Sequence, residues 1–255
     1  MDSKWLNGLY SLEGKTALVV GYAGNLGPIW VETLNNAGAK TFAIGMPSPK
    51  ESNIDAPPPN VCDVTKPSDL WKFDHITPDI LVYNAAIDNP PNAEEEDGWD
   101  MFRNYEAITQ VNQFGAVNAM RFFIPKMIEN GGGSVHLIGS IMGYGPPDNS
   151  NYPVCPSGAV WEKPLAYGTS KRAYLNMAQW VTKKYGEHGV RCTVPAFGPI
   201  DMGQLSGDFM AKITDKIPMR HFTTIKDLQR TLLFHACCEN FAGQDTLVDG
   251  GYRER

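Results

Sequence analysis

The sequence predicts a single α/β domain built on a doubly wound parallel sheet. Short apolar runs alternate with amphipathic segments along all 255 residues. The apolar runs are continuous, which is typical of strands buried on both faces of a parallel sheet. Glycine-rich turns follow several of these runs, where a strand would pass into a helix. Because this alternation places helices on both sides of one sheet, and no change in composition marks a boundary, one domain over residues 1–255 is expected.

The first strand and helix form the clearest pair. Residues 17–20 are an apolar run that stops at Gly21, which predicts a buried strand ending in a turn. In the stretch 25–40, apolar side chains recur at helical spacing and Gly38 provides a C-terminal stop. The recurring positions are Leu26, Ile29, Trp30, Leu34 and Ala37.

The later elements continue the alternation. Six further strands are predicted at residues 41–45, 61–64, 79–86, 134–140, 190–196 and 245–251, so the sheet has about seven strands. Helices are predicted at residues 67–73, 100–130 and 165–187. One or two more helices are expected between residues 203 and 230, over the edge of the sheet.

Composition excludes several classes of partner. The formal net charge of −6 argues against nucleic acid or an anionic membrane as the main partner. No window approaches 18 apolar residues, so no membrane span is expected, and the charged N-terminus does not resemble a signal peptide. The five cysteines contain no CxxC pair and the five histidines are scattered, so neither a disulfide framework nor a metal site is expected. A reducing, cytoplasmic setting follows.

The string "GYAGNLG" at residues 21–27 lies between a predicted strand and a predicted helix. Gly21 permits a tight turn, while Gly24 and Gly27 let the backbone approach a pyrophosphate and let the helix pack closely on the sheet. The N-terminus of the helix offers unpaired N–H groups and a positive dipole to an anion. A tight turn with no ligand is the alternative interpretation.

Tyr167 and Lys171 are four residues apart, so both side chains lie on one face of a predicted helix. A nearby ammonium group stabilises a phenolate and lowers the tyrosine pKa, which would allow proton transfer near neutral pH. A pair on a helix surface is the alternative. Ser140, at a strand end, and Asn112, within a helix, carry little weight individually.

Seven short motifs that occur in one order provide stronger evidence than any one of them does individually. They are the glycine-rich turn, "DV" at 63–64, "YNAA" at 83–86, "VN" at 111–112, "GS" at 139–140, the Tyr167/Lys171 pair and "VDGG" at 248–251. In this order and spacing the chain resembles the short-chain dehydrogenase/reductase family over essentially its full length. The resemblance implies a Rossmann-type sheet, a bound NAD or NADP, and an oxidoreductase that interconverts a secondary alcohol and a ketone.

The same resemblance implies residue roles. Tyr167 is the expected catalytic acid/base, Lys171 holds the nicotinamide ribose, Ser140 hydrogen-bonds the substrate oxygen, and Asn112 holds a water in a proton relay. Asp63 and Val64 would flank the adenine, and Asn84–Ala86 would pass under the adenosine ribose. The full set of expected cofactor contacts is Gly21, Asn25, Leu26, Gly27, Met46, Asp63, Val64, Asn84, Ala85, Ala86, Tyr167, Lys171, Gly198 and Ile200.

The chain departs from the family pattern at three places. Val20 replaces a threonine, Asn25 occupies the middle glycine position, and Phe197-Gly198 replaces Pro-Gly. Cofactor choice is also unusual, because Gly45-Met46 ends the second strand without the carboxylate that would bind a ribose 2′-OH. Ser48 and Lys50 could reach a 2′-phosphate, so NADP is favoured slightly over NAD.

Twenty-seven positions separate Ser140 from Tyr167, about twice the usual gap in the resembled family. Residues 143–164 therefore read as an insertion at the carboxyl edge of the sheet, where ligands bind. Tyr144, Tyr152, Trp161 and Lys163 are its candidate contacts to a polar, sugar-like substrate, and residues 201–220 are a second candidate cover. An oligomer contact, or packing of Trp161 over the fold, explains the insertion equally well.

The phrases "YNAAIDNPP" and "WEKPLAYGTSK" also resemble dehydrogenases of nonulosonic (legionaminic-type) sugar pathways. The family resemblance further implies a homodimer or homotetramer, with the helices at 100–130 and 165–187 in the interface. Two other functions fit the same fold: a cofactor-independent lyase of the halohydrin-dehalogenase kind, and a non-catalytic nucleotide-binding regulator. Lys171 argues against the lyase, and the complete set of four candidate catalytic residues argues against the regulator.

Overall fold

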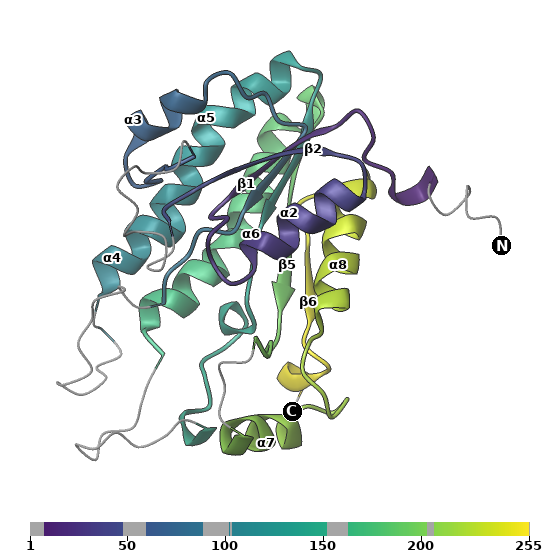
Figure 1. Ribbon diagram of the computed structural model, residues 1–255. Coiled ribbons are helices and arrows are strands. Elements are labelled where there is room, and N and C mark those ends of the chain that lie inside the picture. Colours follow the sequence, from purple (N-terminus) through teal and green to yellow (C-terminus); the bar gives the residue numbers. More distant parts are fainter. Residues whose placement is uncertain are drawn as a thin grey trace.

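A computed structural model describes residues 8–47, 60–88, 102, 104–151, 163–202 and 207–254 of the chain. Its centre is a six-stranded sheet in the order β2-β1-β3-β4-β5-β6, in which all neighbouring strands are parallel (Figure 1). The strands are β1 (Thr16–Val20), β2 (Lys40–Ile44), β3 (Ile80–Tyr83), β4 (Gly133–Leu137), β5 (Val190–Phe197) and β6 (Asp245–Val248). The doubly wound α/β prediction is confirmed.

Helices cover both faces of the sheet (Figure 1). They are α2 (Gly27–Asn36), α3 (Pro67–Leu70), α4 (Tyr105–Thr109), α5 (Gly115–Glu129), α6 (Leu165–Tyr185), α7 (Gly207–Lys216) and α8 (Ile225–Cys237). The predicted helix at 165–187 thus ends as α6 followed by a 3₁₀ turn, Gly186–His188. Residues 207–230 contain α7 and the start of α8, separated by a loop, which agrees with the one or two helices expected there.

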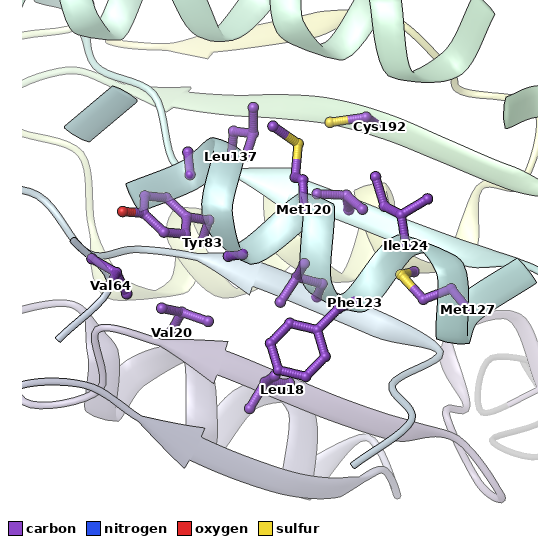
Figure 2. Packing of buried hydrophobic residues seen from close by; sticks show 14 of the residues in the cluster. Leu18, Val20, Val64, Tyr83, Met120, Phe123, Ile124, Met127, Leu137 and Cys192 are labelled. Atoms are coloured by element: carbon purple, nitrogen blue, oxygen red, sulfur yellow. The ribbon is translucent and has the colours of Figure 1, made fainter. Parts of the chain in front are cut away.

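Alternate residues of each strand face opposite sides, which produces two apolar cores. Leu18 and Val20 point toward α5, where they meet Phe123 and its neighbours (Figure 2). Val19 points the other way, toward Trp30 of α2 and the buried face of α8. The sheet is therefore buried on both faces, as the continuous apolar runs predict.

The strand predicted at residues 61–64 is wrong. Val61 forms a single parallel bridge with Gly45 just beyond β2, and the chain then turns. The Asp63 carboxylate accepts hydrogen bonds from the backbone N–H of Thr65 at 3.0 Å and from its hydroxyl at 2.7 Å. This local turn leads directly into α3 at Pro67, so the backbone leaves the sheet edge after one pairing.

The long helix predicted at 100–130 is interrupted. Within the described residues it runs from Tyr105 to Glu129, with a π-helical turn at Gln110–Phe114 between α4 and α5. A π-turn replaces i→i+4 hydrogen bonds by i→i+5 bonds and occurs frequently at functional sites. No helix among the described residues is both long and apolar enough to cross a bilayer.

Candidate active site

The glycine-rich turn joins the carboxyl end of β1 to α2, and two of its glycines are required by the chain itself. Gly21 has φ +90°, and a Cβ atom there would lie 2.4 Å from the backbone nitrogen of Ala85. A Cβ atom on Gly27 would lie 2.0 Å from the carbonyl oxygen of Tyr22. Gly24 is different, because no atom comes nearer than 3.6 Å to its added Cβ. Close packing thus explains Gly21 and Gly27, whereas a Cβ atom at Gly24 would make only ordinary contacts with Asn84 and Gly21.

The N-terminus of α2 suits an anion. Leu26 is the N-cap residue and supplies no side-chain hydrogen bond, and the first turn contains no acidic side chain. The N–H of Gly27 donates to the carbonyl of Gly24 at 3.0 Å and Pro28 has no N–H, so the helix dipole is the main source of positive potential there. A dinucleotide pyrophosphate needs such an arrangement, so the residues of this turn fit the cofactor.

Asn84 holds the turn in place from the end of β3. Its amide nitrogen donates to the carbonyl of Gly21 at 2.8 Å, and its amide oxygen accepts from the indole N–H of Trp30 at 2.8 Å. The backbone N–H groups of Asn84 and Ala85 both donate to Val20. Asn84, which was expected beneath the adenosine ribose, therefore links β1, β3 and α2. The backbone of Ala85 and Ala86 follows directly and lies beside the glycine-rich turn.

The expected adenine contacts divide into exposed and buried residues. Met46 lies just beyond β2 and is 56% exposed. Asp63 pairs with Lys66 at 3.2 Å in addition to its bonds with Thr65. The Val64 side chain packs in the core between the sheet and α5, so only its backbone is placed for a ligand. Ser48 and Lys50 lie outside the described residues.

Ser140, Tyr167 and Lys171 meet beyond the carboxyl end of β4. The Ser140 hydroxyl caps a 3₁₀ turn by accepting from the N–H of Met142 at 3.2 Å, and it lies near enough to the Tyr167 hydroxyl to lower the pKa of that group. The Lys171 ammonium donates to the carbonyl of Ile138 at 2.8 Å and lies 5.7 Å from the centroid of the Tyr167 ring. The predicted trio therefore forms one cluster.

The pKa of Tyr167 differs from the prediction, because it is raised and not lowered. Burial, together with the Asp88 carboxylate, raises the pKa of Tyr167 to about 12, although the Ser140 hydroxyl acts in the opposite direction. Burial also lowers the pKa of Lys171 to about 7. The loss of hydration on burial is the largest cause, so Tyr167 is a protonated phenol at neutral pH.

Asn112 lies in the π-turn and is fully buried. Its amide oxygen accepts from the N–H of Ile87 at 2.9 Å, and its amide nitrogen donates to the carbonyl of Ile87 and to the hydroxyl of Ser170. Its backbone carbonyl accepts from the Tyr174 hydroxyl at 2.8 Å. The sequence interpretation missed Ser170 and Tyr174. Their positions three residues after Tyr167 and Lys171, on the same helix, were the available signal.

The candidate substrate contacts are only partly described. Lys163 forms an ion pair with Asp88, and its ammonium lies 5.4 Å from the centroid of the Tyr167 ring. The Tyr144 hydroxyl donates to Asp245, so this group is already bonded within the chain. Tyr144 and Lys163 line one cavity of about 530 Å³, together with Arg172. Tyr152 and Trp161 lie outside the described residues.

Gly198 and Ile200 follow β5 and close the same edge of the sheet. The N–H of Gly198 donates to the carbonyl of Val248, and a Cβ atom at Gly198 would lie 2.6 Å from the Cα of Asp249. Ile200 forms a single bridge with Thr223. Both expected cofactor residues therefore lie at the carboxyl edge, with Gly198 required by packing.

Comparison with known sequences decides the family. The family model described as enoyl-(acyl carrier protein) reductase, of the short-chain alcohol dehydrogenase type, matches residues 60–253. The chain belongs to the short-chain dehydrogenase/reductase family. It is an oxidoreductase of this family, whose members bind NAD or NADP, and the comparisons contain no support for the lyase alternative.

Relatives in the short-chain dehydrogenase/reductase family are distant. An uncharacterized short-chain type dehydrogenase/reductase, y4mP of Sinorhizobium fredii, is 26% identical over 88% of this chain and 91% of its own length. The 3-oxoacyl-[acyl-carrier-protein] reductase FabG of Thermotoga maritima is 26% identical over 94% of this chain and 98% of its own length. None of the similarities points to nonulosonic sugar pathways in particular.

Solved structures of the short-chain dehydrogenase/reductase family share the fold. A gluconate 5-dehydrogenase from Burkholderia cenocepacia, solved with NADP and tartrate, has a TM-score of 0.74 and 19% identity, over 98% of this chain and 99% of that protein. A short-chain dehydrogenase from Leptospira borgpetersenii with bound NAD+ has a TM-score of 0.73 and 20% identity, over 96% and 95%.

Proposed function

We propose that this enzyme interconverts a secondary alcohol and a ketone on a polar, sugar-like substrate, with Tyr167 transferring the proton. The observation that carries the proposal is the cluster of the half-buried Ser140 and Tyr167 with the buried Lys171 at the carboxyl edge of the sheet. This edge also carries the glycine-rich turn and the uncapped N-terminus of α2. A hydroxyl pair beside an anion-binding turn is the minimum that such a reaction requires.

A nicotinamide, when bound, exchanges hydride with the substrate carbon. Ser140 donates a hydrogen bond to the substrate oxygen and orients it toward Tyr167. Tyr167 gives its proton to that oxygen during reduction and takes it back during oxidation. With a pKa of about 12, the phenol holds its proton at neutral pH, which suits ketone reduction. Lys171 stays close to the ring through its bond to the carbonyl of Ile138.

For the cofactor we favour NADP over NAD. Gly45-Met46 at the end of β2 presents no carboxylate, and a carboxylate there would repel a 2′-phosphate. Gly24 and the N-terminus of α2 would hold the pyrophosphate, and Asp63, with the backbone near Ala85, would border the adenosine. Among similar structures, the Burkholderia protein was solved with NADP and the Leptospira protein with NAD+, so the fold accepts either.

The proposed substrate is polyhydroxylated. Around one cavity, Tyr144 offers an aromatic surface, Arg172 a cationic group and Lys163 an ammonium group paired with Asp88, a composition suited to hydroxyls and a carboxylate. The Burkholderia structure is a gluconate 5-dehydrogenase, which acts on a ligand of this chemistry. The narrower resemblance to nonulosonic sugar dehydrogenases is consistent with the same class of substrate.

The test is a Tyr167→Phe variant, assayed for turnover of a panel of polyhydroxylated ketones with NADPH and with NADH. Loss of the proton donor should lower kcat by about 10²- to 10⁴-fold while the Kd for nucleotide stays unchanged. Tyr185→Phe, on the last turn of the same helix, is the matched control. Full activity in Tyr167→Phe would refute the assignment, and nucleotide binding without turnover in the unmodified enzyme would favour a regulatory protein.

We also propose a homodimer or homotetramer assembled through α5 and α6. The outer faces of these helices and the preceding π-turn expose large apolar side chains: Phe114 at 53%, Val117 at 41% and Trp180 at 69%. Sedimentation equilibrium of the intact chain should give two or four times the monomer mass, and Trp180→Glu should shift it toward the monomer. A monomeric mass for the unmodified chain would contradict the assembly.

A further inference from the structure

A third apolar cluster lies apart from the two main cores, at the carboxyl edge of the sheet. Ile213 and Ile217 of α7 pack there with Phe222, and Met210 and Tyr252 lie against them. Figure 1 shows α7 beyond the ends of the strands, beside the C-terminus. This helix therefore rests on a small core of its own.

Lys216, on the last turn of α7, connects this helix to the segment that follows Ser140. Its ammonium group lies 2.5 Å from the Asp148 carboxylate, 3.1 Å from the Ser150 hydroxyl and 2.5 Å from the amide oxygen of Asn151. We call these four residues the Lys216 junction. One ammonium group thus uses three donors on three neighbouring acceptors, which fills its hydrogen-bonding capacity.

The acceptors of the Lys216 junction are held in position by their own segment. The Asp148 carboxylate also accepts from the N–H and the hydroxyl of Ser150, at 3.0 and 2.6 Å. Asn151 is only 3% exposed, and its amide nitrogen donates to the Tyr252 hydroxyl at 3.3 Å. Hydrogen bonding from Lys216 is the largest cause that lowers the pKa of Asp148, to about 2. The ion pair therefore persists throughout the neutral range.

The C-terminal segment holds the same residues from another side. The Arg253 guanidinium donates to the carbonyl of Pro146 at 3.4 Å, and it lies against Gly145 so closely that a Cβ atom there would collide with it. The Asp249 carboxylate in turn accepts from the N–H of Arg253. Residues 145–151, α7 and residues 249–254 thus contact one another as a unit.

We infer that Lys216 is a positioning residue that makes α7 and residues 145–151 a single wall of the substrate site. The inference rests on the proposed function, because residues 145–151 follow Ser140 and α7 follows β5 at the edge that carries Tyr167. The side chains of Lys216 and Asp148 are 36% and 47% exposed, and exposed ion pairs contribute little to global stability. The contribution of Lys216 is therefore local, through the buried Asn151.

The test compares Lys216→Met with Lys212→Met, an exposed lysine one turn earlier on α7. Amide hydrogen exchange should accelerate about tenfold in Lys216→Met, in both residues 145–151 and residues 207–217, because the two segments lose one shared contact. KM for the ketone should rise about tenfold with kcat within about twofold, since the wall binds substrate and performs no chemistry. Lys216→Arg should restore both values, and Lys212→Met should change neither.

Two results would overturn the inference. Faster exchange in only one of the two segments would show that they do not depend on each other. An unchanged KM, with faster exchange in both, would show that the unit is not a wall of the substrate site. Hydrogen exchange requires no turnover, so it decides the coupling even if no ketone is reduced. Failure of the proposed function is seen separately, in the unmodified enzyme.

Discussion

The Tyr174 hydroxyl joins the two helical segments that carry the candidate catalytic residues. It extends from α6 to the carbonyl of Asn112 in the π-turn, and both residues are fully buried. The Asn112 amide in turn holds Ile87 and Ser170. The placement of α6 against the loop after β3, and with it the placement of Lys171, depends on this chain of contacts.

Replacing Tyr174 by Phe removes the hydroxyl that donates to the buried Asn112 carbonyl. The free energy of unfolding should fall by about 0.5–1.5 kcal/mol, the net contribution of one hydrogen bond. Urea unfolding measured in parallel with Tyr185→Phe, whose residue lies half-buried at the helix end, provides the measurement and its control. A loss equal to that of the control would show that the hydroxyl is not bonded.

At the scale of elements, periodicity and glycine placement were sufficient for most of the fold. Continuous apolar runs identified β1 and β3, because strands buried on both faces are dominated by apolar residues. The runs in β4 and β5 are interrupted by the buried polar residues Ser134, His136, Arg191 and Thr193, yet their remaining apolar residues were sufficient. The strand prediction at residues 61–64 failed although "VCDV" has apolar residues typical of a strand. The Asp63 carboxylate accepts two hydrogen bonds from Thr65, and this turn ends the pairing after the single bridge at Val61. Local side-chain bonds of this kind are not visible in apolar periodicity.

The candidate site was likewise predictable from the sequence only in part. The trio of Ser140, Tyr167 and Lys171 was predictable from motif order, because strand ends and the first turn of the next helix meet at one edge of a parallel sheet. The raised pKa of Tyr167 could not be predicted from the sequence, because it depends on the depth of burial rather than on the presence of Lys171. The π-turn at Asn112 was also unpredictable, because one residue of difference in hydrogen-bond spacing leaves no mark in the composition.

At the scale of the whole molecule, the sheet carries a buried polar network between β4, β5, β6 and α8. The Thr193 hydroxyl bonds to His136 at 2.8 Å and to His235 at 2.7 Å. The outer nitrogens of the two rings bond to Ser134 at 3.0 Å and to Thr246 at 2.8 Å. Burial, and next the Arg191 charge, lowers the pKa of both imidazoles, that of His235 to about 3.

This network predicts sensitivity to mild acid. An unfolded histidine binds a proton below its ordinary pKa of about 6.5, whereas the folded imidazoles stay neutral, so the free energy of unfolding falls as pH decreases from 6.5 toward 3. Each histidine should contribute up to about 1.4 kcal/mol per pH unit in that window. Urea unfolding between pH 7 and pH 5 measures the slope, and His235→Gln should reduce it by about half. A slope of zero in the unmodified protein would contradict the burial of both rings.

The π-turn between α4 and α5 has a consequence for chain length. An α-helix advances about 100° per residue, so deleting one residue from Gln110–Phe114 to restore regular bonding would rotate α4 by that angle relative to α5. Ile108, now fully buried, would then turn toward solvent, and Asn112 would leave Ile87. This helix tolerates changes of residue type at its exposed positions, but its residue count is fixed, because the extra residue sets the angular phase between its two halves.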